Sequence, residues 1–303
     1  MKWRWPWQAH GAGRGERIAV TVHEGQIDLV ASRNGEIVAA CSVMNDGLAP
    51  AVQRFLDAAN LQSPCCSVVL PTGSYQILLV EAPPVPPQEL AAALRWKVKD
   101  LVKLPLEQAV IDGFRLPDDA FRGRQKMAYT VATDRARLQQ LVDELVACEL
   151  VVDRVLIPEL VMAQAVNESL HDEHTEVVLV IGRNAGFLCV FSGGAIYLAR
   201  NVGLSEETLA QLAGEQREEL LENFLLELQR SRDYFESQMG KGVVGRILVV
   251  PTEQDSAVLC DVIKERMRLP VELVQSDIIT RGSAAYAVAG AEPLLLASAS
   301  LAA

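Results

Sequence analysis

A pattern of three apolar strands occurs twice in this chain, and this duplication limits the possible folds more than any other feature. In the first half the strands are predicted at residues 18–22, 27–31 and 36–43. In the second half the pattern returns at residues 177–181, 186–191 and 195–200. A constant offset of 159 residues aligns Gly35 with Gly194, both in hairpin turns, and Leu29 with Leu188. The chain therefore contains two copies of one β-meander.

Helices and further strands follow each copy. The first copy precedes a helix predicted at residues 50–60. After the second copy we predict a long helix at 205–239, a strand at 246–250, a helix at 254–267 and a strand at 271–274. Strands that alternate with helices in two similar halves indicate an α/β protein with mixed sheets.

A third pattern separates the two halves. Its predicted strands are residues 67–70, 76–81, 110–115, 126–133 and 153–156. A proline-rich approach leads to a helix that begins at Leu90 and continues to Pro105, a second helix spans 135–148, and an exposed polar loop is expected at 117–125. The expected division is a flexible tip at 1–15, the start of the first half at 16–66, an inserted α+β subdomain at 67–157, the second half at 158–290 and a tail at 291–303.

The charge balance argues against a nucleic-acid partner. The chain has 28 Lys and Arg against 39 Asp and Glu, a net charge of −11, whereas a general nucleic-acid binder needs a basic surface. Apolar runs such as 177–181 are far shorter than the roughly 18 residues that cross a bilayer. The N-terminus has no apolar signal core. We therefore expect a cytoplasmic protein whose six scattered cysteines are reduced.

The N-terminal tip concentrates the tryptophans of the chain. Trp3, Trp5 and Trp7 alternate with Lys2, Arg4 and Pro6. Indole rings and cations suit the headgroup region of a membrane, so we predict a peripheral membrane contact here. Packing of the tip on a partner or on its own domain stays open.

Common ligand motifs are incomplete in this chain. The Gly-Lys pair at 240–241 is followed by Gly rather than Ser or Thr, so it does not form a phosphate loop. The glycines at 11–15 precede a strand instead of following one. His171 and His174 lie among acidic residues, where a solvated charge run is preferred over a metal site. We expect no metal site and no catalytic residue.

Three segments match a known family in the right order: residues 90–107, 226–238 and 269–273. With the two meanders, they resemble the MshI/PilM family of type IV (MSHA) pilus biogenesis proteins over about residues 16–290. That family is similar to actin, hexokinase and the Hsp70 ATPase domain. The resemblance implies an α/β, actin-like (ribonuclease H-like) two-lobed fold, with duplicated β-meander halves and a small α+β inserted subdomain.

The resemblance also identifies a nucleotide site that has lost its chemistry. Members that bind ATP have Asp and Gly in each phosphate turn and Gly-Gly beside the adenosine. At these places this chain has Thr21, His23, Val180, Gly182, Pro251 and Thr252. Magnesium needs carboxylate ligands, so the resemblance implies no ATP or Mg²⁺ cofactor and no enzyme activity, with weak nucleotide binding left open. The alternative is an active actin-like ATPase or sugar-kinase-like enzyme with divergent phosphate loops.

The family further implies a protein partner. PilM-like proteins hold the N-terminal cytoplasmic tail of a single-pass membrane protein, PilN or its MshJ-like counterpart, in a groove between the first half and the insert. The candidate groove and rim residues here are Arg95, Trp96, Lys99, Lys103, Leu104 and Leu106. Trp96 is the leading candidate because Trp is enriched at binding hot spots, whereas core packing is an equal alternative for Leu104 and Leu106.

The expected function is therefore a non-catalytic scaffold of a pilus assembly complex, cytoplasmic and peripherally associated with the inner membrane. The acidic segment 205–239 is mostly a solvated face, and a cytoplasmic assembly ATPase is a further possible partner for it. A GspL-like cytoplasmic domain of type II secretion, which shares the fold, is a third interpretation.

Overall fold

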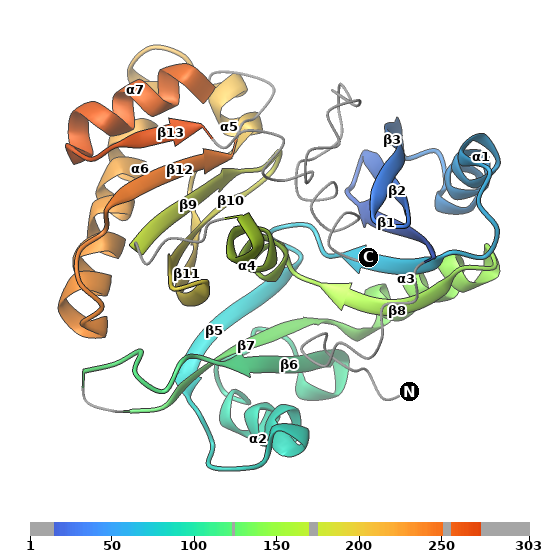
Figure 1. Cartoon of the computed structure of the whole chain (residues 1–303), viewed down its shortest axis with the longest axis horizontal. Coiled ribbons are helices and arrows are strands. Elements are labelled where there is room, and N and C mark those ends of the chain that lie inside the picture. The colour runs from blue at the N-terminus through green and yellow to red at the C-terminus, as the bar shows by residue number, and fades with distance from the viewer. Residues whose placement is uncertain (1–14, 123–124, 170–174, 251–255, 274–303) are drawn as a thin grey trace. The chain divides into compact units, whose positions relative to one another are not determined.

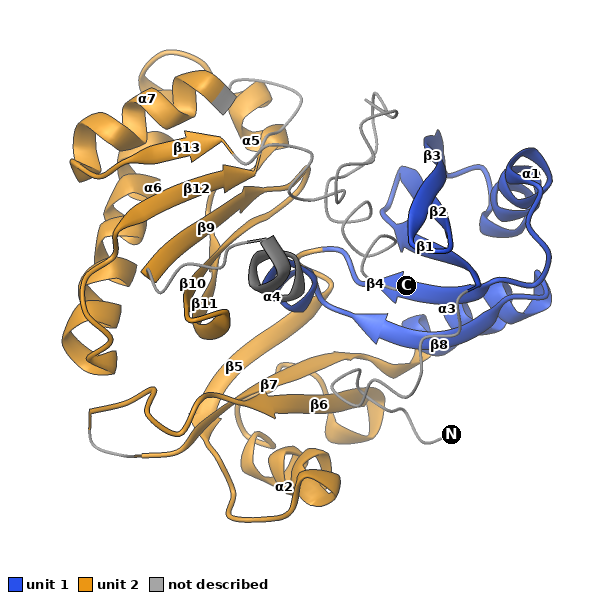
Figure 2. Cartoon of the chain, viewed as in Figure 1, with its two compact units in different colours: residues 1–71, 137–169, 275–303 blue, residues 72–136, 170–274 orange. Residues whose placement is uncertain are grey.

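Each predicted meander forms part of a five-stranded sheet in the computed structural model, which describes residues 15–122, 125–169, 175–250 and 256–273. Figure 1 shows the helices and strands along the chain, which divides into two compact units (Figure 2). Unit 1 comprises residues 1–71, 137–169 and 275–303, and unit 2 comprises residues 72–136 and 170–274. Trp3, Trp5 and Trp7 lie outside the described residues.

The sheet of unit 1 has the strand order β3-β2-β1-β4-β8. Its strands are β1 (Glu16–Val22), β2 (Gln26–Arg33), β3 (Glu36–Met44), β4 (Cys65–Val69) and β8 (Val151–Leu156). The first three are antiparallel, and the β2–β3 turn places Asn34 and Gly35 at positive φ, as a two-residue hairpin requires. β4 and β8 add in parallel. The helices of this unit are α1 (Leu48–Ala59), most of α3 (Arg135–Ala147) and α4 (Pro158–Ser169).

The two faces of this sheet differ in polarity. Side chains alternate along a strand, and the register places Thr21 opposite Asp28 and Ala19 opposite Ser67. Arg17, Thr21, Asp28 and Ser67 therefore share one face, where all four are buried. The opposite face is apolar, and α1 supplies a matching stripe in Leu48, Val52, Phe55 and Leu56.

Unit 2 contains the second copy of the sheet, in the equivalent order β11-β10-β9-β12-β13. Its strands are β9 (Thr175–Ile181), β10 (Gly186–Ser192), β11 (Ala195–Val202), β12 (Arg246–Val250) and β13 (Val271–Leu273). Its helices are α5 (Glu206–Gln211), α6 (Glu215–Tyr234), a short π-helix at Phe235–Met239 and α7 (Ser256–Met267). The matching strand orders confirm that the duplicated sequence pattern encodes a duplicated topology.

A separate three-stranded antiparallel sheet, β5-β7-β6, also belongs to unit 2. Its elements are β5 (Tyr75–Glu81), β6 (Ala109–Arg115), β7 (Met127–Asp134), α2 (Leu90–Lys97) and short 3-10 turns at Pro87–Glu89 and Leu106–Gln108. Leu90, Leu94 and Val98 pack on this sheet. The helix approaches so closely that a Cβ on Gly113 would lie 2.6 Å from Leu94 Cδ1.

Two predicted helices are wrong in extent. The helix from Leu90 ends at Lys97, and tight turns that begin at the buried Val98 follow it. The apolar residues therefore continue at similar spacing although the chain is no longer helical. The predicted helix 205–239 is broken at 212–214, where Gly214 takes a positive φ and a new helix begins.

The insert and its loop also differ from expectation. β8 and most of β4 fall within the expected insert 67–157 but pair into the sheet of unit 1, so the separate sheet spans residues 75–134. The loop 117–125 is not wholly exposed. Ala120 is buried, and the backbone N–H of Arg122 donates to the carbonyl of Gln238. This bond anchors the loop on the short π-helix.

Candidate functional site

The first phosphate-turn position lies where β1 passes into β2. Thr21 is buried near the end of β1. The backbone N–H of His23 donates to the carbonyl of Gln26 at 2.8 Å, and the side chain of Asn45 donates to the carbonyl of His23 at 3.3 Å. An anion-binding turn points its N–H groups at the ligand, whereas this turn directs the N–H of His23 into its own hairpin.

A buried carboxylate that was not predicted from the sequence lies beside Thr21. Asp28 on β2 stands opposite Thr21. One carboxylate oxygen accepts hydrogen bonds from Gln26 Nε2 at 2.7 Å and Ser42 Oγ at 2.5 Å, and the other lies 3.1 Å from His23 Nε2. The side chain of Asp28 is 1% exposed, so it offers no open face to a ligand. A charged residue inside the apolar run 27–31 is the signal that could have revealed it.

The second phosphate-turn position is closed in a similar way. Val180 is buried in β9, and the N–H of Gly182 donates to Ala185 at 3.1 Å. The first N–H groups of α5, those of Glu206 and Glu207, donate to the carbonyls of residues 182 and 183 at 3.1 and 3.0 Å. Free N–H groups at a helix start favour anions, and here these two have backbone partners.

The structure does not describe the remaining nucleotide-site positions or the histidine pair. Outside the described residues lie Pro251, Thr252, His171 and His174. Within the described part of the chain, no three His, Cys, Asp or Glu side chains gather as metal ligands would. The six cysteines are free thiols.

The predicted groove residues separate into exposed and inward-facing groups. Trp96 is 71% exposed at the end of α2, and Leu101 in the following turns is 54% exposed. Lys99 and Lys103 are also exposed. We call Trp96, Lys99, Leu101 and Lys103 the α2 surface. It combines two large apolar side chains with two cations.

Arg95, Leu104 and Leu106 support this surface from within. The Arg95 guanidinium donates from Nη1 to the carbonyl of Ala109 at 3.1 Å and from Nη2 to the carbonyl of Leu106. Leu104 and Leu106 are partly buried against the core beneath α2. Core packing, the alternative for these two leucines, therefore agrees with their positions. Arg95 holds the chain after α2 against the helix.

None of the described helices is both long and apolar enough to cross a membrane. This finding applies to the described ranges, which do not include the N-terminal tip or the tail.

Comparison with solved structures identifies the fold. The chain resembles the PilM-PilN type IV pilus biogenesis complex with a TM-score of 0.71 and 16% identity, covering 86% of this chain and 89% of the other. It also resembles the cytoplasmic domain of EpsL, an inner membrane component of the type II secretion system of Vibrio cholerae, with a TM-score of 0.53 and 15% identity over 94% of both chains.

A third similar structure is a protein of unknown function with an actin-like ATPase fold from Bacteroides thetaiotaomicron. Its TM-score is 0.55 at 9% identity, covering 86% of this chain and 91% of that one. No protein-family model and no curated protein matches the sequence. Together with the duplicated sheets, these likenesses show that the chain has the actin-like ATPase fold.

Proposed function

We propose that this protein is a non-catalytic scaffold of a type IV, MSHA-like pilus assembly complex, similar to MshI and PilM. It acts in the cytoplasm at the inner membrane, where it binds the N-terminal cytoplasmic tail of a PilN/MshJ-like protein. The likeness to the PilM-PilN complex supports this partner. The N-terminal tryptophans would add a membrane contact, and the acidic helix α6 would meet an assembly ATPase.

The observation that carries the proposal is the exposure of Trp96. A Trp side chain left 71% exposed on a helix that is braced by Arg95 has a large unburied apolar area. Such rigid aromatic anchors contribute most of the affinity at protein interfaces. Asp100 lies 4.0 Å from Lys99 and offsets part of its charge, so the two lysines leave a net positive charge on this surface. That charge favours a peptide with acidic residues next to its apolar anchors.

The experiment is a fluorescence anisotropy titration with a labelled peptide that copies the N-terminal tail of the pilus membrane protein. Trp96→Ala is expected to weaken binding at least tenfold with an unchanged unfolding midpoint. Val243→Ala, which truncates another exposed apolar residue of unit 2, serves as the matched control and should bind normally. Equal affinity of the Trp96 variant and the wild type would remove the α2 surface from the interface.

An active actin-like ATPase is the second candidate, and Asp28 is the observation in its favour. This carboxylate lies beside Thr21, near the place where the family resemblance puts a magnesium ligand. Its hydrogen bonds and its burial argue that it is a structural group instead.

A further inference from the structure

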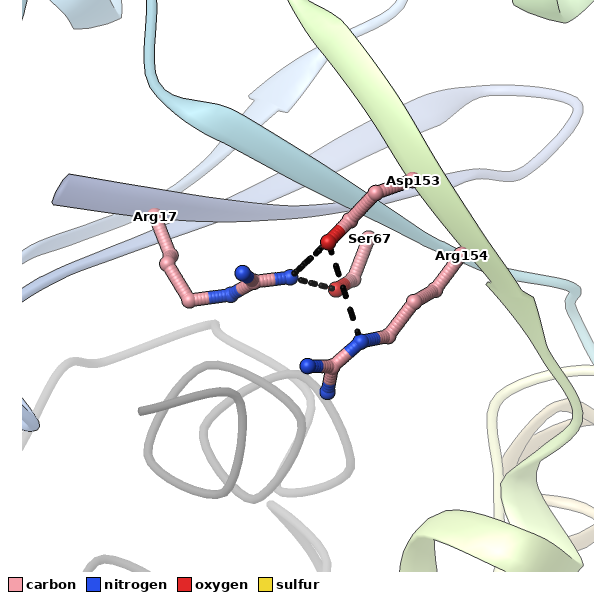
Figure 3. A network of polar contacts seen from close by, with 4 residues as sticks. All are labelled: Arg17, Ser67, Asp153 and Arg154. Atoms are coloured by element: carbon pink, nitrogen blue, oxygen red, sulfur yellow. Dashed lines mark hydrogen bonds and ion pairs between the residues drawn. The ribbon is translucent and has the colours of Figure 1, made fainter. Parts of the chain in front are cut away.

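Three adjacent strands of unit 1 bring two arginines and one carboxylate together on the polar face of the sheet (Figure 3). Arg17 lies on β1, Ser67 on β4, and Asp153 and Arg154 on β8. Arg17 Nη2 donates to both carboxylate oxygens of Asp153, at 2.9 and 2.7 Å, and lies 3.4 Å from Ser67 Oγ. None of these residues belongs to the phosphate turns or to the α2 surface.

The cluster has more positive than negative charge. Arg154 Nε is 3.8 Å from Asp153 Oδ2, an ion-pair distance that is too long for a hydrogen bond. One carboxylate therefore serves two guanidinium groups. Burial lowers the pKa of Arg154, as does the nearby charge of Arg17, and Asp153 opposes this effect only in part. A buried charge without a full counter-charge is costly.

Donors in the cluster are also left over. Arg17 Nε is buried and has no hydrogen-bond acceptor among the described residues. Arg154 forms the ion pair with Asp153 and donates no hydrogen bond within the part of the chain that the structure describes. The side chains of Asp153 and Arg154 are 31% and 23% exposed, so solutes reach the cluster from their side. Arg17 is only 6% exposed.

We propose that Arg17 and Arg154 form a binding site for one small oxyanion, a carboxylate or a phosphate group. The fork of N–H groups on Arg154 matches two oxygens of either group. Arg17 Nε supplies a further donor, because Asp153 occupies only the Nη2 of that residue. Asp153 holds Arg17 in place but also repels an anion, so we expect weak binding.

The test is the thermal unfolding midpoint of the full chain in sodium phosphate, sodium acetate and sodium chloride at equal ionic strength. We expect a saturable rise in phosphate or in acetate above that in chloride. A rise in phosphate alone assigns a phosphate ligand, and a rise in acetate alone assigns a carboxylate. Equal midpoints in all three salts would overturn the proposal.

Variants locate the effect. Arg154→Gln is expected to raise the half-saturating anion concentration at least tenfold. Arg154→Lys keeps the charge but loses the paired N–H groups, so its half-saturating concentration should lie between those of the wild type and Arg154→Gln. Arg54→Gln removes the same charge from the exposed side of α1 in the same unit and should respond as the wild type does. An anion response that survives unchanged in Arg154→Gln would also overturn the proposal.

Discussion

The hydroxyl oxygen of Tyr129 on β7 accepts a hydrogen bond from the backbone nitrogen of Ala199 on β11, at 2.8 Å. This bond joins the three-stranded sheet to the edge of the second five-stranded sheet within unit 2. Tyr129 is almost fully buried, and its ring packs against Phe114 with centroids 5.5 Å apart. The contact is therefore both apolar and polar, and the polar part is separable by mutation.

Tyr129→Phe is expected to destabilise the protein by about 1–3 kcal/mol, because it leaves the buried N–H of Ala199 without an acceptor while the ring packing stays. Urea unfolding monitored by circular dichroism measures the change. Tyr234→Phe, in which a half-buried side chain of α6 loses its hydroxyl group, is the comparison. A free energy of unfolding within 0.5 kcal/mol of the wild type, roughly the range of a neutral surface change, would show that the bond does not contribute.

Asp112 on β6 should make stability depend on pH. Burial raises its pKa from 3.8 to about 6, although the N–H of Gly113 opposes the shift. The folded state therefore binds the proton more tightly than the unfolded state, so stability is greatest below the unfolded pKa and falls as pH rises towards about 6. Two pKa units correspond to roughly 3 kcal/mol at most.

Asp112→Asn is thus expected to be more stable than the wild type at pH 7, with the difference shrinking towards pH 4. The amide oxygen of Asn keeps an acceptor for Gly113. Asp100→Asn alters an exposed carboxyl group and should give no such trend. Parallel stability curves for the wild type and Asp112→Asn across this range would contradict the assignment.

The sequence allowed prediction of the sheets because their signal is local. Each meander carries its own turns and apolar runs, and the constant offset between Gly35 and Gly194 requires the same topology twice. The sequence patterns did not predict the pairing of β4 with β8. These strands are about 80 residues apart in the sequence, and a local pattern does not identify a distant parallel neighbour.

The residue types at the candidate site could be predicted from the sequence, but the directions of their side chains could not. The missing carboxylates at Thr21 and Val180 follow from the sequence. The inward orientation of Arg95 does not, because a helix of eight residues followed by turns places its cations by tertiary contacts rather than by helical spacing. Asp28 was missed because its partners, Gln26, Ser42 and His23, become neighbours only when the meander forms.

Arg95→Met should loosen the chain that follows α2. It removes two charge-assisted hydrogen bonds to the carbonyls of Leu106 and Ala109, so we expect a loss of about 1.5–3 kcal/mol and faster amide exchange around residues 106–109. Lys97→Met breaks only an exposed ion pair with Glu81 and should cost less than about 0.5 kcal/mol. Equal effects of the two substitutions would mean that Arg95 is not a brace.

Gly113→Ala tests the close packing of α2 on its sheet. The added Cβ would lie 2.2 Å from the carbonyl oxygen of Tyr129, which belongs to the backbone and cannot rotate away. We expect a loss of more than about 3 kcal/mol, since overpacking is seldom relieved when the neighbour is main chain. Gly25→Ala has nothing within 4 Å of the new methyl group and is the control. Unfolding midpoints compare the two variants directly.

Thr21→Asp tests whether one carboxylate restores nucleotide binding. The new side chain would stand opposite Asp28 in the β1–β2 register, and like charges directly opposite one another destabilise a sheet by up to about 1 kcal/mol. The N–H of His23 would still be bonded to Gln26, so the turn would gain charge without gaining donors for phosphate. We therefore expect neither the wild type nor this variant to bind Mg-ATP in calorimetric titrations, and the variant to unfold at a lower temperature. Micromolar binding by the wild type would instead support the ATPase interpretation and make Asp28 the first residue to mutate.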